Sequence, residues 1–106
     1  MSALSLRRAP GKLLGLLATL VGLASVAAAV ILVLYIVLVE FKANPRNVIV
    51  RDIKDIARPL AWVFKDLFTP RSYRLRVLVN YGIAAIVYLL VGRLIVRVLN
   101  LAGAAD

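Results

Sequence analysis

The stretch that decides the fold is an uncharged run at residues 13–39, which reads LLGLLATLVGLASVAAAVILVLYIVLV. A helix of these 27 residues is about 40 Å long, whereas the hydrocarbon core of a bilayer is about 30 Å thick. A short basic head at residues 1–12 precedes the run, and Glu40 ends it. This pattern predicts a tilted transmembrane helix at residues 13–39.

A second apolar run begins at Val77 and carries no charge as far as Gly92. That segment is shorter than the roughly 20 residues needed for a crossing, but apolar residues continue to Leu101. We therefore expect a transmembrane helix at residues 77–101 and a short tail at 102–106, with Arg93 and Arg97 extending their side chains to lipid headgroups. The same two arginines share a helix face and could instead bind a lipid phosphate or an acidic residue of a partner.

The connector at residues 40–76 is basic and amphipathic. Apolar residues recur at the three-and-four spacing of one helical face, and charged residues fill the other face. Such a helix lies in the headgroup layer of an anionic membrane or packs on a partner protein, and we favour the membrane. We expect the helix near residues 46–68, with either a kink at Pro59 or two short helices that meet there, and helix starts at Asn44-Pro45 and Thr69-Pro70. The predicted lipid-interface residues of the connector are Arg51, Lys54, Arg58, Trp62 and Lys65.

The composition of the chain agrees with a membrane protein. Of its 106 residues, 63% are hydrophobic, and 14 Lys and Arg against 5 Asp and Glu give a net charge of +9. Soluble domains are about 45–50% apolar, so the composition argues against a soluble globule and excludes a disordered chain. Because the basic residues are interleaved with apolar ones and no nucleic-acid recognition fold is indicated, the expected partner is anionic lipid and not nucleic acid.

Together these segments predict an all-α membrane protein, a two-span transmembrane helical hairpin with a kinked amphipathic interfacial helix in its connector. Small residues allow close helix packing and mark either the hairpin contact or an oligomer face. The predicted helix-packing residues are Gly15, Ala18, Gly22 and Ser25 in the first span and Gly82 and Ala85 in the second. Asn80, Tyr81 and Tyr88 are expected to hydrogen-bond across helices, as polar groups in lipid do.

The first apolar run has a second interpretation, because a basic head followed by the alanines at 27–29 is similar to a cleavable secretory signal. The apolar region of a signal is about 7–15 residues long, and this run is longer. We therefore favour a retained anchor and a multi-pass protein of the inner (plasma) membrane.

The chain offers little catalytic chemistry. It contains no Cys and no His, which excludes thiolate and imidazole metal sites and the usual nucleophile–base pairs. Asp52, Asp55 and Asp66 lie among basic residues, where we interpret them as charge partners. An ion pathway normally has an ionisable group within a span, and Glu40 lies at the end of one. We expect no enzyme activity, no cofactor and no metal site.

The middle of the chain, at about residues 30–96, resembles the YggT family of small two-span membrane proteins of bacteria and plastids. The resemblance depends on Asn44-Pro45, on IKDIARPL at residues 53–60 and on LFTP at residues 67–70. It implies a plasma-membrane protein without catalytic residues, of a kind linked to osmotic tolerance, cell-division gene neighbourhoods and cytochrome-complex maturation in plastids.

The function that we expect is that of an accessory or scaffold protein that binds anionic lipid and a larger membrane partner or further copies of itself. The alternative is a small pore-forming or channel-like oligomer, similar to a holin. Nine of the basic residues lie in the connector, which favours a cytoplasmic connector under the positive-inside rule, whereas the basic head before the first span favours the opposite orientation.

Overall fold

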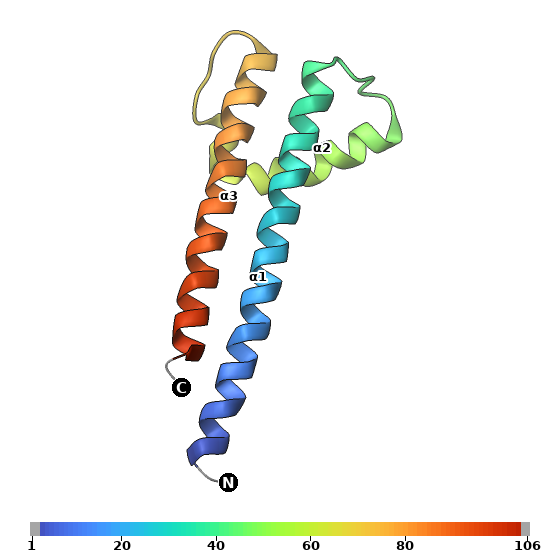
Figure 1. The fold of residues 1–106 in the computed structure, drawn as a ribbon. Helices are drawn as coiled ribbons and strands as arrows, with labels where there is room; N and C mark the ends of the chain where they lie inside the picture. The colour runs from blue at the N-terminus through green and yellow to red at the C-terminus, as the bar shows by residue number, and fades with distance from the viewer. Residues whose placement is uncertain (1–2, 105–106) are drawn as a thin grey trace.

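The computed structural model describes the backbone of residues 3–104 and the side chains of residues 11–103. All regular structure in this range is helical, with α1 at Ala3–Glu40, α2 at Val48–Ala61, a 3-10 helix η1 at Trp62–Asp66 and α3 at Tyr73–Ala104. Helices α1 and α3 form an antiparallel hairpin with both termini at one end (Figure 1). We call that end the terminal end and the opposite end, where α1 finishes and α3 begins, the loop end.

The two long helices have the length and apolar character needed to cross a membrane, over Gly11–Glu40 and Tyr73–Gly103. In their most apolar windows only 28% and 17% of the residues are buried, so each helix is apolar on the sides that it exposes. A helix that is apolar all round belongs in a protein core or in lipid, and these helices have too little protein around them for a core. The predicted all-helical hairpin of two apolar helices is confirmed.

Both long helices extend beyond the predicted spans. Helix α1 already begins at Ala3, so the backbone of the predicted head continues the first helix instead of forming a separate segment; Met1 and Ser2 lie outside the described residues. Helix α3 begins at Tyr73 and runs on through residues 102–104 of the predicted tail, whose last two residues are not described.

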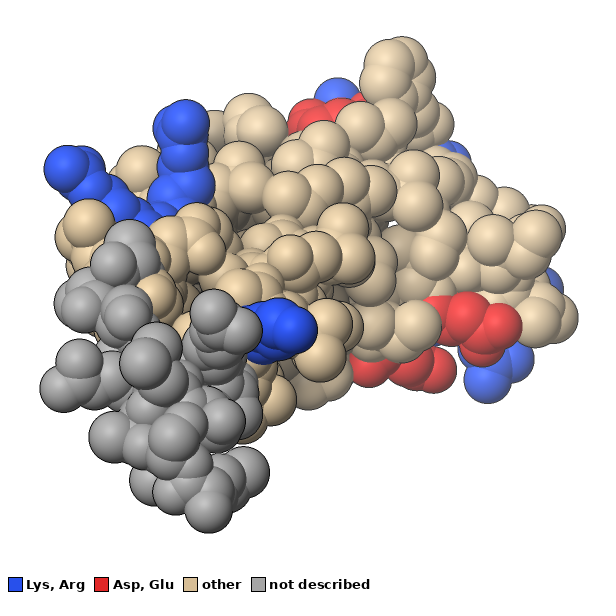
Figure 2. Space-filling model, turned by 60° about the horizontal axis from the view of Figure 1, so that its bottom comes forward, with Lys and Arg blue, Asp and Glu red and all other residues tan. Residues whose placement is uncertain are grey.

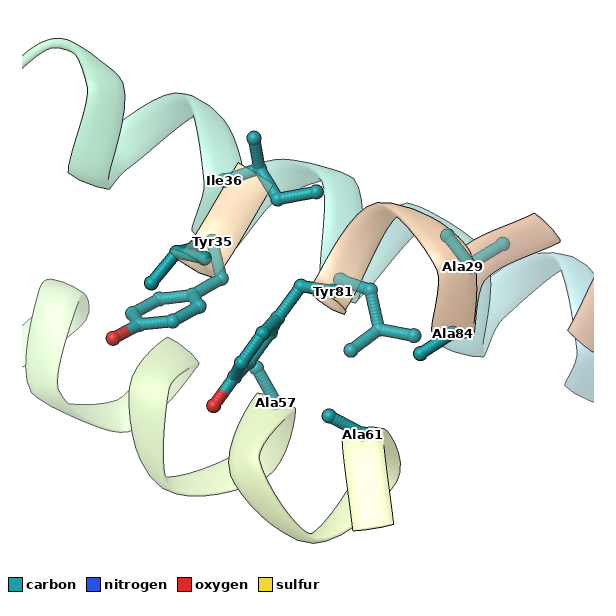
Figure 3. Packing of buried hydrophobic residues seen from close by; sticks show 10 residues of the cluster. Ala29, Tyr35, Ile36, Ala57, Ala61, Tyr81 and Ala84 are labelled. Atoms are coloured by element: carbon teal, nitrogen blue, oxygen red, sulfur yellow. The ribbon is translucent and has the colours of Figure 1, made fainter. Parts of the chain in front are cut away.

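Helix α2 crosses the side of the hairpin at some distance from the loop end (Figure 1). Its residues Ala57 and Ala61 are fully buried, and their small side chains allow α2 to approach the two long helices closely. Figure 3 shows both alanines directed toward the hairpin, while Tyr35 of α1 and Tyr81 of α3 are directed toward α2. The centroids of the two tyrosine rings are 5.1 Å apart. The buried cluster at this crossing contains Ala29, Leu32, Tyr35, Ile36, Ala57, Ala61, Val77, Tyr81, Ala84 and Ala85.

The predicted bend at Pro59 is not confirmed. Pro59 lies inside α2, and the α-helix continues past it to Ala61. Proline removes one amide donor, which costs the carbonyl of Asp55 its intrahelical partner, and a single missing bond so near the helix end does not stop the helix. The α-helix ends at Ala61, and the chain changes direction at Trp62, where φ is 44° and ψ is −123°. It then continues as η1.

The end of α1 is closed by a Schellman motif. The amide of Ala43 donates to the carbonyl of Leu38 at 2.8 Å, and the amide of Lys42 donates to the carbonyl of Val39 at 3.0 Å. Lys42 occupies the position that normally favours glycine, with φ of 54°. This motif turns the chain back toward the side of the hairpin, where α2 packs.

The helix starts lie later in the chain than their predicted positions. The side-chain oxygen of Asn47 accepts the amide of Ile49 at 2.9 Å and so caps α2, whereas Asn44 forms a turn in which its side chain accepts the amide of Arg46. The hydroxyl of Ser72, and not Thr69, accepts an amide in the first turn of α3. In both cases the Asn-Pro or Thr-Pro pair lies in the turn before the capping residue.

Candidate functional site

Two polar side chains of α3 hold the connector on the hairpin. Asn80 is fully buried; its side-chain oxygen accepts the amide of Phe68 at 2.9 Å, and its nitrogen donates to the carbonyls of Lys65 at 2.9 Å and Phe68 at 2.7 Å. The hydroxyl of Tyr88 donates to the carbonyl of Leu60 at 2.7 Å. These backbone groups lie where the regular helices of the connector end, so they have no partner within a helix. The two side chains of α3 supply the partners and fix the position of the connector along the hairpin.

Helix α2 presents three chemically different sides. The two buried alanines face the hairpin. Leu60 lies on a mainly apolar flank that is directed toward the terminal end, where it reaches the middle of α3. Ile56 precedes it by one helical turn on the same side, and the exposed Asp52 lies one turn earlier. Arg51, Lys54 and Arg58 lie on the opposite flank, which is directed toward the loop end and the first turns of α3. The predicted amphipathic character therefore becomes a cationic flank and an apolar flank on either side of a contact with the hairpin.

The apolar flank borders a groove of about 520 Å³. Trp62, which directly follows α2 and has a positive φ, contributes to this groove, and 71% of the residue is exposed. The groove is lined by Ser25, Leu60, Trp62, Phe64, Val87, Tyr88, Val91, Gly92 and Ile95. Figure 2 turns the terminal end toward the viewer: uncharged residues make up most of this face, and both basic and acidic side chains are also visible on it.

The cationic flank borders a cavity of about 220 Å³ between α2, η1 and α3, which we call the basic cleft. Its four cations come from three elements, with Lys54 and Arg58 one helical turn apart on α2, Lys65 on η1 and Arg76 on α3. One carboxylate, that of Asp66, is also present. Val77 and the tyrosines at positions 73 and 81 complete the walls.

The loop end beside the cleft contains a second set of polar contacts. The hydroxyls of Tyr35 and Tyr73 are 2.6 Å apart, and the guanidinium of Arg74 contacts both the carboxylate of Glu40 at 3.4 Å and its carbonyl at 3.0 Å. These contacts join the last two turns of α1 to the first turn of α3. Arg51 lines a neighbouring cavity here rather than the basic cleft.

The predicted lipid-interface residues form two groups at different levels of the hairpin. Those of the connector lie together: Lys54, Arg58 and Lys65 line the basic cleft, Arg51 lies beside it, and Trp62 lies on the opposite, apolar side of the connector. Arg93 and Arg97 are exposed on α3 toward the terminal end, where they line a shallow groove with Ser25 and Asn100.

The predicted helix-packing residues divide in a similar way. Ala18 and Ala85 are buried, Gly22 faces Val96 of α3, and a methyl group added at Gly92 would overlap the side chain of Ser25. A side chain added at Gly15 or Gly82 would meet nothing within 4 Å, so these two glycines are not part of the hairpin contact. The closest approach of α1 and α3 that involves a glycine lies at Ser25 and Gly92.

Sequence reasoning missed the α3 side of the basic cleft. Arg76, Tyr73 and Tyr81 line it, but in the sequence Arg76 is only the last basic residue before an apolar run. Their spacing could have given a signal: Tyr73, Arg76 and Tyr81 fall on neighbouring positions of one helical face when the helix is started at Tyr73 rather than at Val77.

Comparison of this chain with models of known families, with curated proteins and with solved structures gives no match.

Proposed function

We propose that this protein is a non-enzymatic accessory or scaffold protein of a bacterial inner membrane, similar to the YggT family, which binds anionic lipid through its connector and supports a larger membrane partner. The observation that carries the proposal is the separation of the two flanks of α2, cationic toward the loop end and apolar toward the terminal end. A helix with this division of faces is suited to the boundary between lipid headgroups and hydrocarbon.

The level of α2 along the hairpin supports a location at a membrane surface. The connector packs at Leu32 of α1 and Ala84 of α3. From these residues to Gly11 and Gly103 at the terminal end the helices extend for about 32 Å and 29 Å, close to the roughly 30 Å of a hydrocarbon core. A bilayer surface at α2 thus leaves the right length of both helices to cross the membrane. The cations of the connector would then lie among headgroups, where each gains about 1 kcal/mol of attraction to anionic lipid.

Two features support a partner within the membrane. Arg93 lies about 14 Å along α3 from Ala84, which is inside the hydrocarbon core when α2 marks the surface. It forms no salt bridge with another of the described residues, and a charge at that depth usually pairs with an opposite charge. At the loop end, Val37 of α1 and Phe41, which directly follows this helix, are exposed beyond the position of α2, where they would project from the hydrocarbon without cover.

The lipid half of the proposal is tested with the protein's single tryptophan, Trp62. The full chain is reconstituted in bilayers that mix phosphatidylcholine with phosphatidylglycerol, and either lipid is brominated in its acyl chains in turn. At equal mole fractions, we expect brominated phosphatidylglycerol to quench Trp62 more strongly, and added salt to reduce the difference. Equal quenching by both lipids at low salt would contradict anionic-lipid binding by the connector.

The partner half is tested by purification of the full chain from its native membrane in a mild detergent. We expect a larger membrane protein to co-purify at fixed stoichiometry, to be lost with Arg93→Leu and to be retained with Lys12→Gln, which also removes one positive charge from the hairpin. Purification of the chain alone, together with dye leakage from vesicles that contain it, would favour the pore-forming alternative.

A further inference from the structure

We propose that the basic cleft binds one phosphate group, which belongs either to a lipid headgroup or to free inorganic phosphate. The lipid form rests on the proposed function, because it needs the connector to lie among headgroups. The free form does not, because it needs only the cleft itself.

The cleft collects positive charge that the described part of the chain does not neutralise. Lys54, Arg58 and Arg76 form no salt bridge among the described residues. Lys65 contacts Asp66 at 3.9 Å, and the side chain of Asp66 is 73% exposed, so that pair is weak. Four cations with one exposed carboxylate leave a formal charge of +3 in a cavity of about 220 Å³. Like charges that are held together repel one another. An anion in the cleft would attract each of the cations and offset this repulsion.

The cleft also contains hydrogen-bond donors that lack acceptors. The Nε atom of Arg76 is buried and has no hydrogen-bond partner among the described residues, although buried donors are nearly always paired. When the hydroxyl of Tyr35 donates to that of Tyr73, the Tyr73 hydroxyl, which lines the cleft, keeps its own hydrogen for a third group.

The donor set is suited to phosphate in particular. The guanidinium of Arg58 can offer a planar pair of N–H donors, and two ammonium groups add point charges around it. The guanidinium of Arg76 donates through Nη2 to the carbonyl of Pro70 at 3.4 Å and adds its charge and its remaining N–H groups. Inorganic phosphate has four non-bridging oxygens and the monoester of phosphatidic acid has three, so each can accept from several of these donors at once, whereas a carboxylate has two. Val77 and Tyr81 form an apolar wall, which lowers the local dielectric constant and strengthens attraction to the anion.

The experiment uses the full chain in micelles of a non-ionic maltoside detergent, which contains no phosphate, and Trp62 fluorescence follows thermal unfolding. In one arm chloride is replaced by inorganic phosphate at constant ionic strength. In the other arm a small fraction of phosphatidic acid or phosphatidylglycerol is added, and native mass spectrometry counts the anionic lipids retained by each chain. The cleft variants are Arg58→Gln and Lys65→Gln. The control is Arg71→Gln, which removes the same charge from an exposed residue that does not line the cleft.

We expect one tightly retained anionic lipid or a saturable stabilisation by phosphate, weakened about tenfold by either cleft variant and about twofold or less by the control. In chloride and detergent alone we expect Arg58→Gln to unfold at the same or a higher temperature than the wild type, since it relieves repulsion; this separates loss of binding from loss of folding. Retention of an anionic lipid without stabilisation by inorganic phosphate identifies a lipid headgroup as the ligand. Stabilisation by inorganic phosphate without retention of lipid identifies free phosphate.

Equal effects of the cleft variants and the control in both arms would refute phosphate binding by the basic cleft. This holds even where Trp62 quenching shows that the connector attracts anionic lipid. If brominated phosphatidylglycerol does not quench Trp62 more strongly, anionic-lipid binding in the proposed function is refuted instead. The arm with inorganic phosphate then tests by itself whether the basic cleft binds phosphate.

Discussion

Replacement of Asn80 by alanine tests whether a single buried amide holds the connector on the hairpin. The side chain of Asn80 makes three hydrogen bonds to the backbone at Lys65 and Phe68, over distances of 2.7 to 2.9 Å. Alanine removes all three and leaves one amide and two carbonyls of the connector without protein partners. At about 1 kcal/mol of net free energy for each bond, the connector should dock less stably by about 3 kcal/mol. We expect α1 and α3 to stay paired, because their contact at Ser25 and Gly92 lies away from this residue.

The assay is hydrogen exchange of the Phe68 amide in the full chain in bilayers. This amide donates to Asn80 in the native structure, and a loss of about 3 kcal/mol corresponds to a roughly hundredfold fall in its protection. The matched control is Asn100→Ala, which removes an exposed amide from the same helix. Unchanged protection of Phe68 in Asn80→Ala, or equal loss in both variants, would refute the role that we assign to Asn80.

Three further substitutions test the contacts at other points of the hairpin and connector. Gly92→Ala should lower the free energy of unfolding by about 1–3 kcal/mol, because the added methyl group meets a serine of α1, whereas Gly82→Ala has open space and should not; thermal unfolding in detergent compares the two. Lys42→Gly should raise the unfolding free energy by roughly 1 kcal/mol, since glycine adopts positive φ without strain, and no gain in the same assay would contradict the Schellman end of α1. Tyr88→Phe removes the bond to the Leu60 carbonyl and should increase amide exchange at the end of α2 with a loss of about 1 kcal/mol, and exchange equal to that of the wild type would show that this bond is not needed.

Much of the architecture could be predicted because it follows from one-dimensional patterns. The uncharged run at 13–39 and the apolar run from Val77 set two long helices, and the three-and-four spacing of the connector set the faces of α2. Periodicity identifies which residues share a face, but it does not give the level at which the connector crosses the hairpin. That level depends on side chains of α3 that meet the connector far along the chain, such as Asn80 with Phe68.

The candidate site was predictable in part for the same reason. Lys54, Arg58 and Lys65 belong to the connector and could be assigned to one basic face. Arg76 could not, because its place in the cleft requires α3 to begin at Tyr73 and to run back past η1. The direction of Trp62 was also beyond prediction, since it depends on a positive φ that sequence patterns associate with glycine.

The central claim is that α2 lies at a membrane surface with its apolar flank toward the hydrocarbon and its cationic flank toward water. The chain has no native cysteine, so a single spin label can be placed at Ile56→Cys or at Arg51→Cys on opposite flanks of the helix. Power saturation in bilayers that contain anionic lipid then compares the access of each label to oxygen and to a water-soluble nickel complex. We predict that the label at residue 56 reaches oxygen and lies roughly 5–10 Å below the boundary, whereas the label at residue 51 reaches nickel. Equal access of both labels to nickel, or of both to oxygen, would contradict an interfacial connector.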